Sequence, residues 1–290
     1  MRTVGWVLGL SLIAGSAGAG VDVSDDRGRS ITLNAPAQRI VSLAPHVTEL
    51  LFAVGAGAQI VGVSEYSDYP RAAQTLRRIA SAGAIDYETV IGLSPDLVVA
   101  WLSGNGRIAI ERLEELGLQV FATEPRNIAS IARALRALGT LSGHVQQGER
   151  AAAEFETRIR GLRERYAGKH EVSVFYEISA RPLMTLSGAH MFTDVLRLCG
   201  GVNVFADLGT LVATVTTEEV LKRNAEVIMI SSTIPEAEAT QAAWAALPEL
   251  AAARRAQIHI VDSDLLNRQT VRLAEGAAML CELLDQARGS

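Results

Sequence analysis

The feature that most constrains the fold is one long amphipathic segment near the middle of the chain, His144–Tyr166. Its apolar residues recur at alternating steps of four and three, so they lie on one stripe of a helix. The stripe consists of Ala151, Phe155, Ile159, Leu162 and Tyr166. Because arginine, glutamate and glutamine occupy the other faces, the stripe has to be covered by another part of the protein. We therefore predict one backbone helix, residues 142–167, that connects two folded parts.

A similar stretch of sequence occurs on each side of this segment. Glu88–Trp101 and Glu218–Ser231 each begin with an acidic residue, continue as a short helix with apolar positions, and end in a buried strand. Two similar halves around a connecting helix have the outline of a clamp. Such an arrangement favours ligand binding over catalytic turnover.

The order of the predicted elements indicates an α/β fold. Strands alternate with helices on both sides of the long segment, which predicts two Rossmann-like lobes with parallel central sheets, residues 21–141 and 168–290. In such sheets ligands bind beyond the carboxyl ends of the strands. The segment Ser179–His190 is predicted as a loop at one of these ends.

Composition supports a globular protein and excludes some partners. The 290 residues are 49% hydrophobic and 20% charged, which is typical of folded domains, and the length suffices for two of them. The net charge is −5. An acidic surface of this kind argues against nucleic acid and anionic membrane as partners.

The first twenty residues have the features of a secretory signal peptide. Arg2 precedes an apolar run from Val4 to Ala14, and small residues follow at Ala17–Gly20. The apolar run is shorter than the roughly twenty residues that a membrane-spanning helix needs. No cysteine follows the small residues, so a lipid anchor is not expected. We predict residues 1–20 to be cleaved and the remaining protein to be soluble and exported to the periplasm.

Export affects how the two cysteines, Cys199 and Cys281, are interpreted. In an oxidising compartment an isolated pair most simply forms one disulfide. The alternatives are a pair of metal thiolates and a catalytic nucleophile, but neither cysteine has a histidine at ligand spacing.

One motif suggests an enzyme of a different class. Residues 104–109, GNGRIA, fit the dinucleotide-binding pattern, and Glu124 follows at the distance where that pattern places a ribose-binding acid. An exported dehydrogenase is therefore an alternative. Against it, nicotinamide cofactors are scarce outside the cytoplasm, and the motif does not open a strand and helix repeat.

His46 and Glu49 are spaced i, i+3 on one predicted helix and could share a metal ion. We prefer the interpretation that Glu49 is an acid of the first turn that interacts with helix amides. The other histidines form no second ligand pair, so no dedicated metal site is predicted. Tyr66, Tyr69 and Trp101 follow neighbouring strands and are either core aromatics or stacking surfaces beside a cleft.

Several motifs together resemble those of the periplasmic cobalamin-binding proteins of vitamin B12 ABC importers. They are SLAPHVTEL, VGVSEYSDYP, LSPDLVVAWLSGN, LCGGVNVFADL and VTTEEVL, and the similarity extends over nearly the whole chain after residue 20. The wider group binds siderophores, haem and cobalamin. It has two α/β lobes that are bridged by one rigid helix and that close little on binding.

The resemblance implies ligand contacts and docking residues. The corrin contacts fall on these residues: His46, Tyr66, Trp101, Met184, Thr185, Ser187, Gly188, Asp264 and Arg268. One docking carboxylate per lobe falls on Glu88 and Glu218, the acids that begin the repeated stretch. These are expected to meet arginines of an inner-membrane permease dimer, which works with ATPase subunits. Cobalamin would be a transported ligand, and no cofactor is expected.

The sequence departs from the family pattern at three positions. Ala82 and Val212 stand where the cobalamin binders have tryptophans of the cleft, and His46 replaces a small residue. We hypothesise that the imidazole of His46 approaches the corrin and could coordinate cobalt as an axial ligand. Haem or a ferric siderophore is the alternative ligand on the same scaffold, since Tyr66 or His46 could bind the iron of haem.

Overall fold

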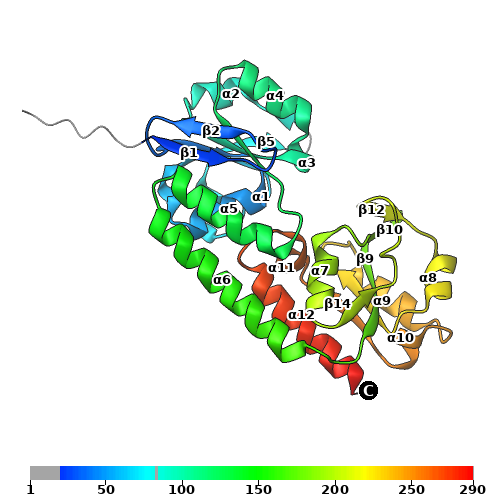
Figure 1. Cartoon of the computed structure of the whole chain (residues 1–290). Helices are drawn as coiled ribbons and strands as arrows, with labels where there is room; N and C mark the ends of the chain where they lie inside the picture. Colours follow the sequence, from blue (N-terminus) through cyan, green and yellow to red (C-terminus); the bar gives the residue numbers. More distant parts are fainter. Residues whose placement is uncertain (1–19, 82–83, 290) are drawn as a thin grey trace, which may run out of the picture.

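The computed structural model describes residues 20–81 and 84–289. Except for Gly20, the predicted signal peptide lies outside these residues. The chain forms two α/β lobes, and one long helix runs along both of them (Figure 1). In the ranges described, no helix has both the length and the apolar character needed to cross a membrane.

A six-stranded sheet forms the centre of the first lobe. Its strand order is β6-β5-β4-β3-β7-β8, and all neighbours are parallel except β5 and β6. The strands are β3 (Ile40–Ser42), β4 (Ile60–Ser64), β5 (Arg78–Ser81), β6 (Ala84–Ile85), β7 (Leu97–Trp101) and β8 (Val120–Thr123). The helices of this lobe are α1 (Pro45–Ala53), η1 (Ala56–Gln59), η2 (Arg71–Thr75), α2 (Tyr87–Gly92), α3 (Leu102–Asn105), α4 (Arg107–Glu115) and α5 (Ile128–Leu141). A hairpin of β1 (Val21–Ser24) and β2 (Ser30–Leu33) precedes them.

The second lobe has a mixed sheet. The strand order is β12-β10-β9-β13-β14, and β11 also pairs with β9. The strands β11, β9, β13 and β14 run parallel to one another. The strand β10 is antiparallel to both of its neighbours, β9 and β12. The strands are β9 (Val172–Ala180), β10 (Leu183–Leu186), β11 (Gly201–Asn203), β12 (Val212–Thr214), β13 (Val227–Ser231) and β14 (Ile258–Val261). The helices are α7 (Met191–Leu198), α8 (Thr217–Arg223), α9 (Ala237–Ala245), α10 (Ala251–Arg254), α11 (Ser263–Asn267) and α12 (Leu273–Arg288).

The long helix is α6 (Val145–Tyr166), and it buries the predicted stripe. Phe155, Ile159 and Tyr166 are buried, and Ala151 and Leu162 pack against the same core. Gly148 of α6 lies against Gly139 of α5 so closely that a Cβ on Gly139 would be 2.9 Å from the Cα of Gly148. The predicted fold class is confirmed, while the lobe boundaries at 141 and 168 stay predictions.

One hydrophobic core continues from the first lobe into the second. It contains Leu50 of α1, Leu135 of α5, Phe155 of α6, Phe192 of α7 and Leu280 of α12. Burial on this scale is the main favourable term in folding, and here it also attaches the lobes to each other. The predicted disulfide is confirmed: Cys199, just after α7, is bonded to Cys281 in α12, at an S–S distance of 2.01 Å.

The structure differs from the prediction at the edges of both sheets. The predicted loop Ser179–His190 contains most of a hairpin, because β9 runs on to Ala180 and β10 returns antiparallel to it. Pro182 lies in the turn between the two strands, and it gave the sequence its loop character. Both sheets contain the predicted parallel strands, whereas the antiparallel pairing of β6, β10 and β12 was not anticipated.

Candidate functional site

A cavity of about 310 Å³ lies between the two lobes. The first lobe lines it with Trp101, Ser103, Glu124, Pro125 and Arg126. The second lobe lines it with Ile178, Leu186, Ala189, His190, Met191, Leu211, Val212, Asn267 and Gln269. Trp101 and Glu124 lie at or just after the carboxyl ends of the parallel strands β7 and β8, so this wall lies where parallel sheets usually bind ligands. Leu211 and Val212 lie at the start of β12. The cavity combines an apolar surface with a few polar groups, as expected of a small-molecule site.

Trp101 at the end of β7 is the aromatic residue of this cavity. Its backbone N–H donates to Oδ1 of Asn105 at 2.7 Å, and Nδ2 of Asn105 donates to the carbonyl of Leu43 at 3.0 Å. These bonds hold the segment after β7 against β3. The indole is partly exposed, so it provides a surface on which a flat ligand could stack.

His46 lies beneath Trp101 in the first turn of α1. The two rings meet edge to face, with their centroids 5.2 Å apart, and His46 is 3% exposed. Burial, with a smaller contribution from the charge of Arg268, lowers the pKa of His46 to about 3. The imidazole is therefore neutral at physiological pH, and its Nε2 forms no hydrogen bond within the described residues. An unpaired buried polar atom is unusual in a folded protein.

Arg268, a predicted ligand contact, is the centre of an ion-pair cluster between the lobes. Its guanidinium is 3.0 Å from Glu49, 2.7 Å from Asp68 and 3.1 Å from Asp264. Asp264, also a predicted contact, therefore lies beside it. These three pairs use Nη1 and Nε of Arg268, and Nη2 lies outside them.

The prediction for Glu49 is wrong. Its carboxylate is 1% exposed, and it accepts hydrogen bonds from Arg268 and Arg272 instead of helix amides. Because α1 begins at Pro45, Glu49 falls outside the first turn and faces the second lobe. No three acidic, cysteine or histidine side chains converge for a metal within residues 20–81 and 84–289.

Tyr66 and Tyr69 lie in the loop after β4. Tyr66 is 70% exposed and has a φ of 61°, which is uncommon for a residue other than glycine. The loop is held from below, since Ser67 accepts a hydrogen bond from Thr48 at 3.0 Å. The ring of Tyr69 lies under the guanidinium of Arg272, 4.0 Å from its centroid. Tyr66 is thus presented to solvent on a well-supported loop.

The predicted contacts from Met184 to Gly188 lie on β10 and in the turn after it. Thr185 and Ser187 are fully buried, and Thr185 donates to the carbonyl of Tyr176 at 2.7 Å. Gly188 packs against the backbone of Ala206, where a Cβ would come within 2.5 Å of the carbonyl oxygen. In this stretch Leu186 is the residue that lines the cavity. Ligand contact at the four predicted residues stays a prediction.

Sequence reasoning missed several residues of the cavity. Arg126, His190, Asn267 and Gln269 line it but belong to no recognisable motif. A usable signal existed for His190, because it ends the segment Ser179–His190, which was predicted as a loop at the carboxyl end of a strand. Glu124 also lines the cavity, and it accepts a hydrogen bond from the N–H of Ser103 at 2.9 Å. The acid that the dinucleotide pattern assigned to a ribose thus fixes the start of α3.

The two acids of the repeated stretch occupy equivalent places. Glu88 lies in the first turn of α2, which precedes the interior strand β7, and Glu218 lies in the first turn of α8, which precedes the interior strand β13. Both side chains are exposed. Figure 1 shows α2 and α8 in different lobes, each on the side of the molecule away from α6.

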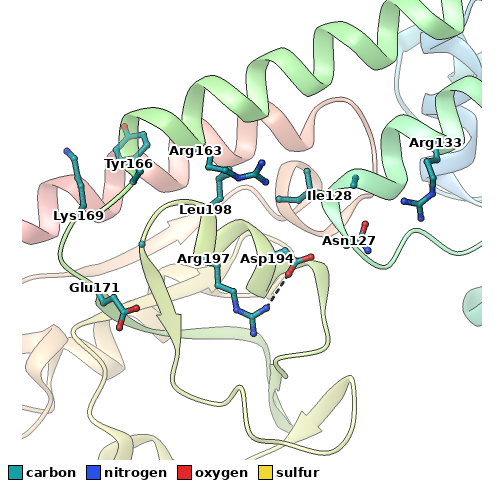
Figure 2. A pocket seen from close by; sticks show the side chains of 14 residues that line it. Asn127, Ile128, Arg133, Arg163, Tyr166, Lys169, Glu171, Asp194, Arg197 and Leu198 are labelled. Atoms are coloured by element: carbon teal, nitrogen blue, oxygen red, sulfur yellow. Dashed lines mark hydrogen bonds and ion pairs between the residues drawn. The ribbon is translucent and has the colours of Figure 1, made fainter.

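A second hollow, of about 740 Å³, lies outside the cleft, where α5, α6 and α7 meet. Figure 2 shows its side chains reaching the hollow from these three helices. Its edges carry Arg133, Arg163, Lys169 and Arg197, and its one aromatic residue, Tyr166, is 2% exposed. Because it offers no aromatic surface, we take the smaller cavity at Trp101 as the candidate ligand site.

The sequence matches a known family. The model of the family described as "Periplasmic binding protein" matches residues 40–265. The chain is 37% identical over 253 residues to a vitamin B12-binding protein of Vibrio cholerae. The aligned region covers 87% of this chain and 91% of that protein.

Solved structures share the fold. A crystal structure of the periplasmic vitamin B12 binding protein of Vibrio cholerae has a TM-score of 0.82 and 37% identity, and the match covers 88% of this chain and 99% of that one. A periplasmic heme-binding protein from Roseiflexus sp. RS-1 has a TM-score of 0.76 at 22% identity, covering 87% of this chain and 99% of that one. At that identity only the fold is shared. These relatives are binding proteins and not enzymes.

Proposed function

Because the chain belongs to the periplasmic binding protein family, we propose that it captures cobalamin or a related corrinoid and delivers it to an ABC transporter permease. The observation that carries this proposal is the 37% identity to a vitamin B12-binding protein, which extends over 87% of the chain and so includes both walls of the cleft. Cobalamin is the transported ligand and not a cofactor. The dehydrogenase alternative has no counterpart among these relatives.

The cavity between the lobes supports this assignment. Trp101 offers an aromatic face to the corrin, and Leu186, Met191 and Leu211 offer apolar surface from the opposite lobe. Burial of such surface supplies most of the affinity in small-molecule sites, while a few polar groups fix the orientation. Asp264 and Arg268 are proposed to meet the amide rim of the corrin, together with Tyr66 on its exposed loop.

His46 is proposed as an axial ligand of the corrin cobalt. Its imidazole is neutral and has a free Nε2, which is the form that binds a metal. Since Trp101 packs against the buried ring, coordination requires the indole to move. Absorption spectra of the cobalamin complex for the wild type and His46→Ala test this: identical spectra and affinities would exclude coordination.

Delivery is proposed to use Glu88 and Glu218. Each is an exposed acid at the start of a helix, one in each lobe, and together they could bind two equivalent subunits of a permease dimer with its ATPase subunits. Residues 1–20 are proposed to act as a cleavable signal peptide that directs the protein to the periplasm.

The central experiment compares three ligands. Purified protein is incubated separately with cyanocobalamin, haem and a ferric siderophore, desalted, and examined by absorption spectroscopy, and affinities are then measured by calorimetry. We expect stoichiometric retention of cyanocobalamin and an affinity loss of tenfold or more in Trp101→Ala. Retention of haem or the siderophore without cyanocobalamin would reassign the ligand. Retention of none would refute the proposal.

A further inference from the structure

His190 is held in a defined orientation at the edge of the cleft. It lines the cavity between the lobes and directly precedes α7. The backbone N–H of Phe192 donates to its Nδ1 at 3.1 Å, so the ring acts as the N-cap of the helix. One nitrogen is therefore committed to the backbone, and the orientation of the ring is fixed by that bond.

This hydrogen bond determines the tautomer. A ring nitrogen that accepts from a backbone N–H cannot carry a proton, so the proton of the neutral imidazole has to be on Nε2. Burial lowers the pKa of His190 to about 4, which keeps the ring neutral at physiological pH. Nε2 makes no hydrogen bond to any of the residues that the structure describes. It lies on the side of the ring away from the Phe192 amide, and it is the polar atom left for the cavity.

We propose that His190 is a specificity-determining residue of the cleft, which donates its Nε2–H to an oxygen acceptor on the rim of the bound ligand. The inference rests on the proposed corrinoid function, because the corrin rim carries amide carbonyl groups. A locked Nε2–H tautomer has no lone pair there, so His190 serves as a donor and not as a metal ligand.

The polar neighbours of His190 in the cavity have the same character. Asn267 accepts from the hydroxyl of Tyr176 with its Oδ1 at 3.3 Å, which leaves its amide N–H groups available. Arg126 is a donor, whereas Glu124 accepts from the N–H of Ser103 at 2.9 Å and keeps further acceptor capacity. The cavity thus offers donors from His190, Asn267 and Arg126 beside one carboxylate. Such a lining suits a ligand whose rim presents carbonyl or carboxylate oxygens.

Two substitutions separate the role of Nδ1 from that of Nε2. In His190→Asn the side-chain oxygen can still accept the Phe192 N–H, since asparagine is a favoured N-cap, but the Nε2 donor is lost. In His190→Gln the amide group reaches about as far as Nε2, but the cap is lost. The first variant should keep the melting temperature and bind cyanocobalamin about 5- to 10-fold more weakly. The second should have a lower melting temperature and an affinity within about twofold of the wild type.

The outcomes distinguish this inference from the proposed function. Wild-type affinity in His190→Asn, or an equal loss in both variants, would overturn the donor role while leaving corrinoid binding intact. Absence of cyanocobalamin binding by the wild type would overturn both. As a measurement that needs no variant, long-range ¹H–¹⁵N NMR of the wild type should show protonated Nε2 and unprotonated Nδ1, with the Nε2 resonance shifting when cyanocobalamin is added. The opposite tautomer, or no shift in the complex, would contradict the inference.

Discussion

The carboxylate of Glu49 in α1 accepts two hydrogen bonds from the guanidinium of Arg272 beside α12, from Nε and from an Nη, each at 2.9 Å. The same carboxylate accepts a third bond from Arg268 at 3.0 Å. Since Glu49 belongs to the first lobe and both arginines to the second, these bonds join the lobes at a point distant in sequence from α6. The lobes are thus connected by α6, by a shared core and by this ion-pair cluster.

We predict that Glu49→Gln destabilises the protein by about 3 kcal/mol or more, because it leaves two partly buried arginines without their shared carboxylate. Urea unfolding followed by circular dichroism measures this loss. Glu156→Gln is the matched control, since Glu156 pairs with Arg136 on an exposed face of α6 and such pairs contribute up to about 1 kcal/mol. Similar losses in both variants would show that the interlobe cluster has no special role.

Stability should fall in acid because of His46. Its pKa of about 3 in the folded protein is below the ordinary value of 6.5, so the unfolded chain takes up a proton first as the pH falls. The contribution of the neutral ring is complete above about pH 6.5 and decreases by about 1.4 kcal/mol per pH unit toward pH 3.

The free energy of unfolding measured from pH 7 to 4 checks this prediction. In His46→Ala the slope should be smaller by roughly one proton, whatever the effect of the substitution at pH 7. Part of the slope should remain, because burial also lowers the pKa values of His190 and His259. If the dependence of the unfolding free energy on pH were the same in His46→Ala as in the wild type, His46 would take up its proton at the same pH in the folded and unfolded protein, which would contradict the prediction.

The disulfide should contribute substantially to stability. It closes a separation of 82 residues, for which the chain-entropy account gives about 4 to 5 kcal/mol. We expect the double variant Cys199→Ala, Cys281→Ala to have a lower urea midpoint, and dithiothreitol to lower the midpoint of the wild type while leaving the double variant unchanged. A wild-type midpoint that is insensitive to the reductant after confirmed reduction would contradict this.

The parts of the fold that depend on local periodicity could be predicted from the sequence. The stripe of α6 follows from the spacing of Phe155, Ile159 and its neighbours, and the interior parallel strands follow from buried runs between helices. The strand β10 could not be identified, because Pro182 before it and Gly188 after it are stronger signals for a loop. Its residues are held as a strand by pairing with β9 and β12, which is a tertiary effect.

Contacts between the lobes could not be predicted from sequence patterns. Glu49 and Arg272 are 223 residues apart, and the spacing of Glu49 from His46 suggested only local roles. Trp101 was identified because an aromatic residue at a strand end is informative by itself. His190 was not, although it ends the predicted loop Ser179–His190, because a single histidine in a loop does not by itself distinguish a ligand contact from a structural role.

Charge reversal at the two exposed acids tests the delivery step. Glu88 and Glu218 each lie in the first turn of a short helix, so Lys at either position should cost about 1 kcal/mol or less in stability. Neither residue lines the cavity of the cleft, and cyanocobalamin affinity should therefore stay at the wild-type value. Uptake of labelled cyanocobalamin into membrane vesicles that contain the permease and its ATPase should fall in each single variant and be abolished in the double variant.

The control variant is Glu154→Lys, which makes the same charge change at an exposed acid on α6. Because α6 lies on the side of the molecule away from α2 and α8, uptake should be unaffected (Figure 1). If uptake fell equally in Glu154→Lys, the effect would be one of net charge; if the double variant transported normally, these two acids would not be the docking residues.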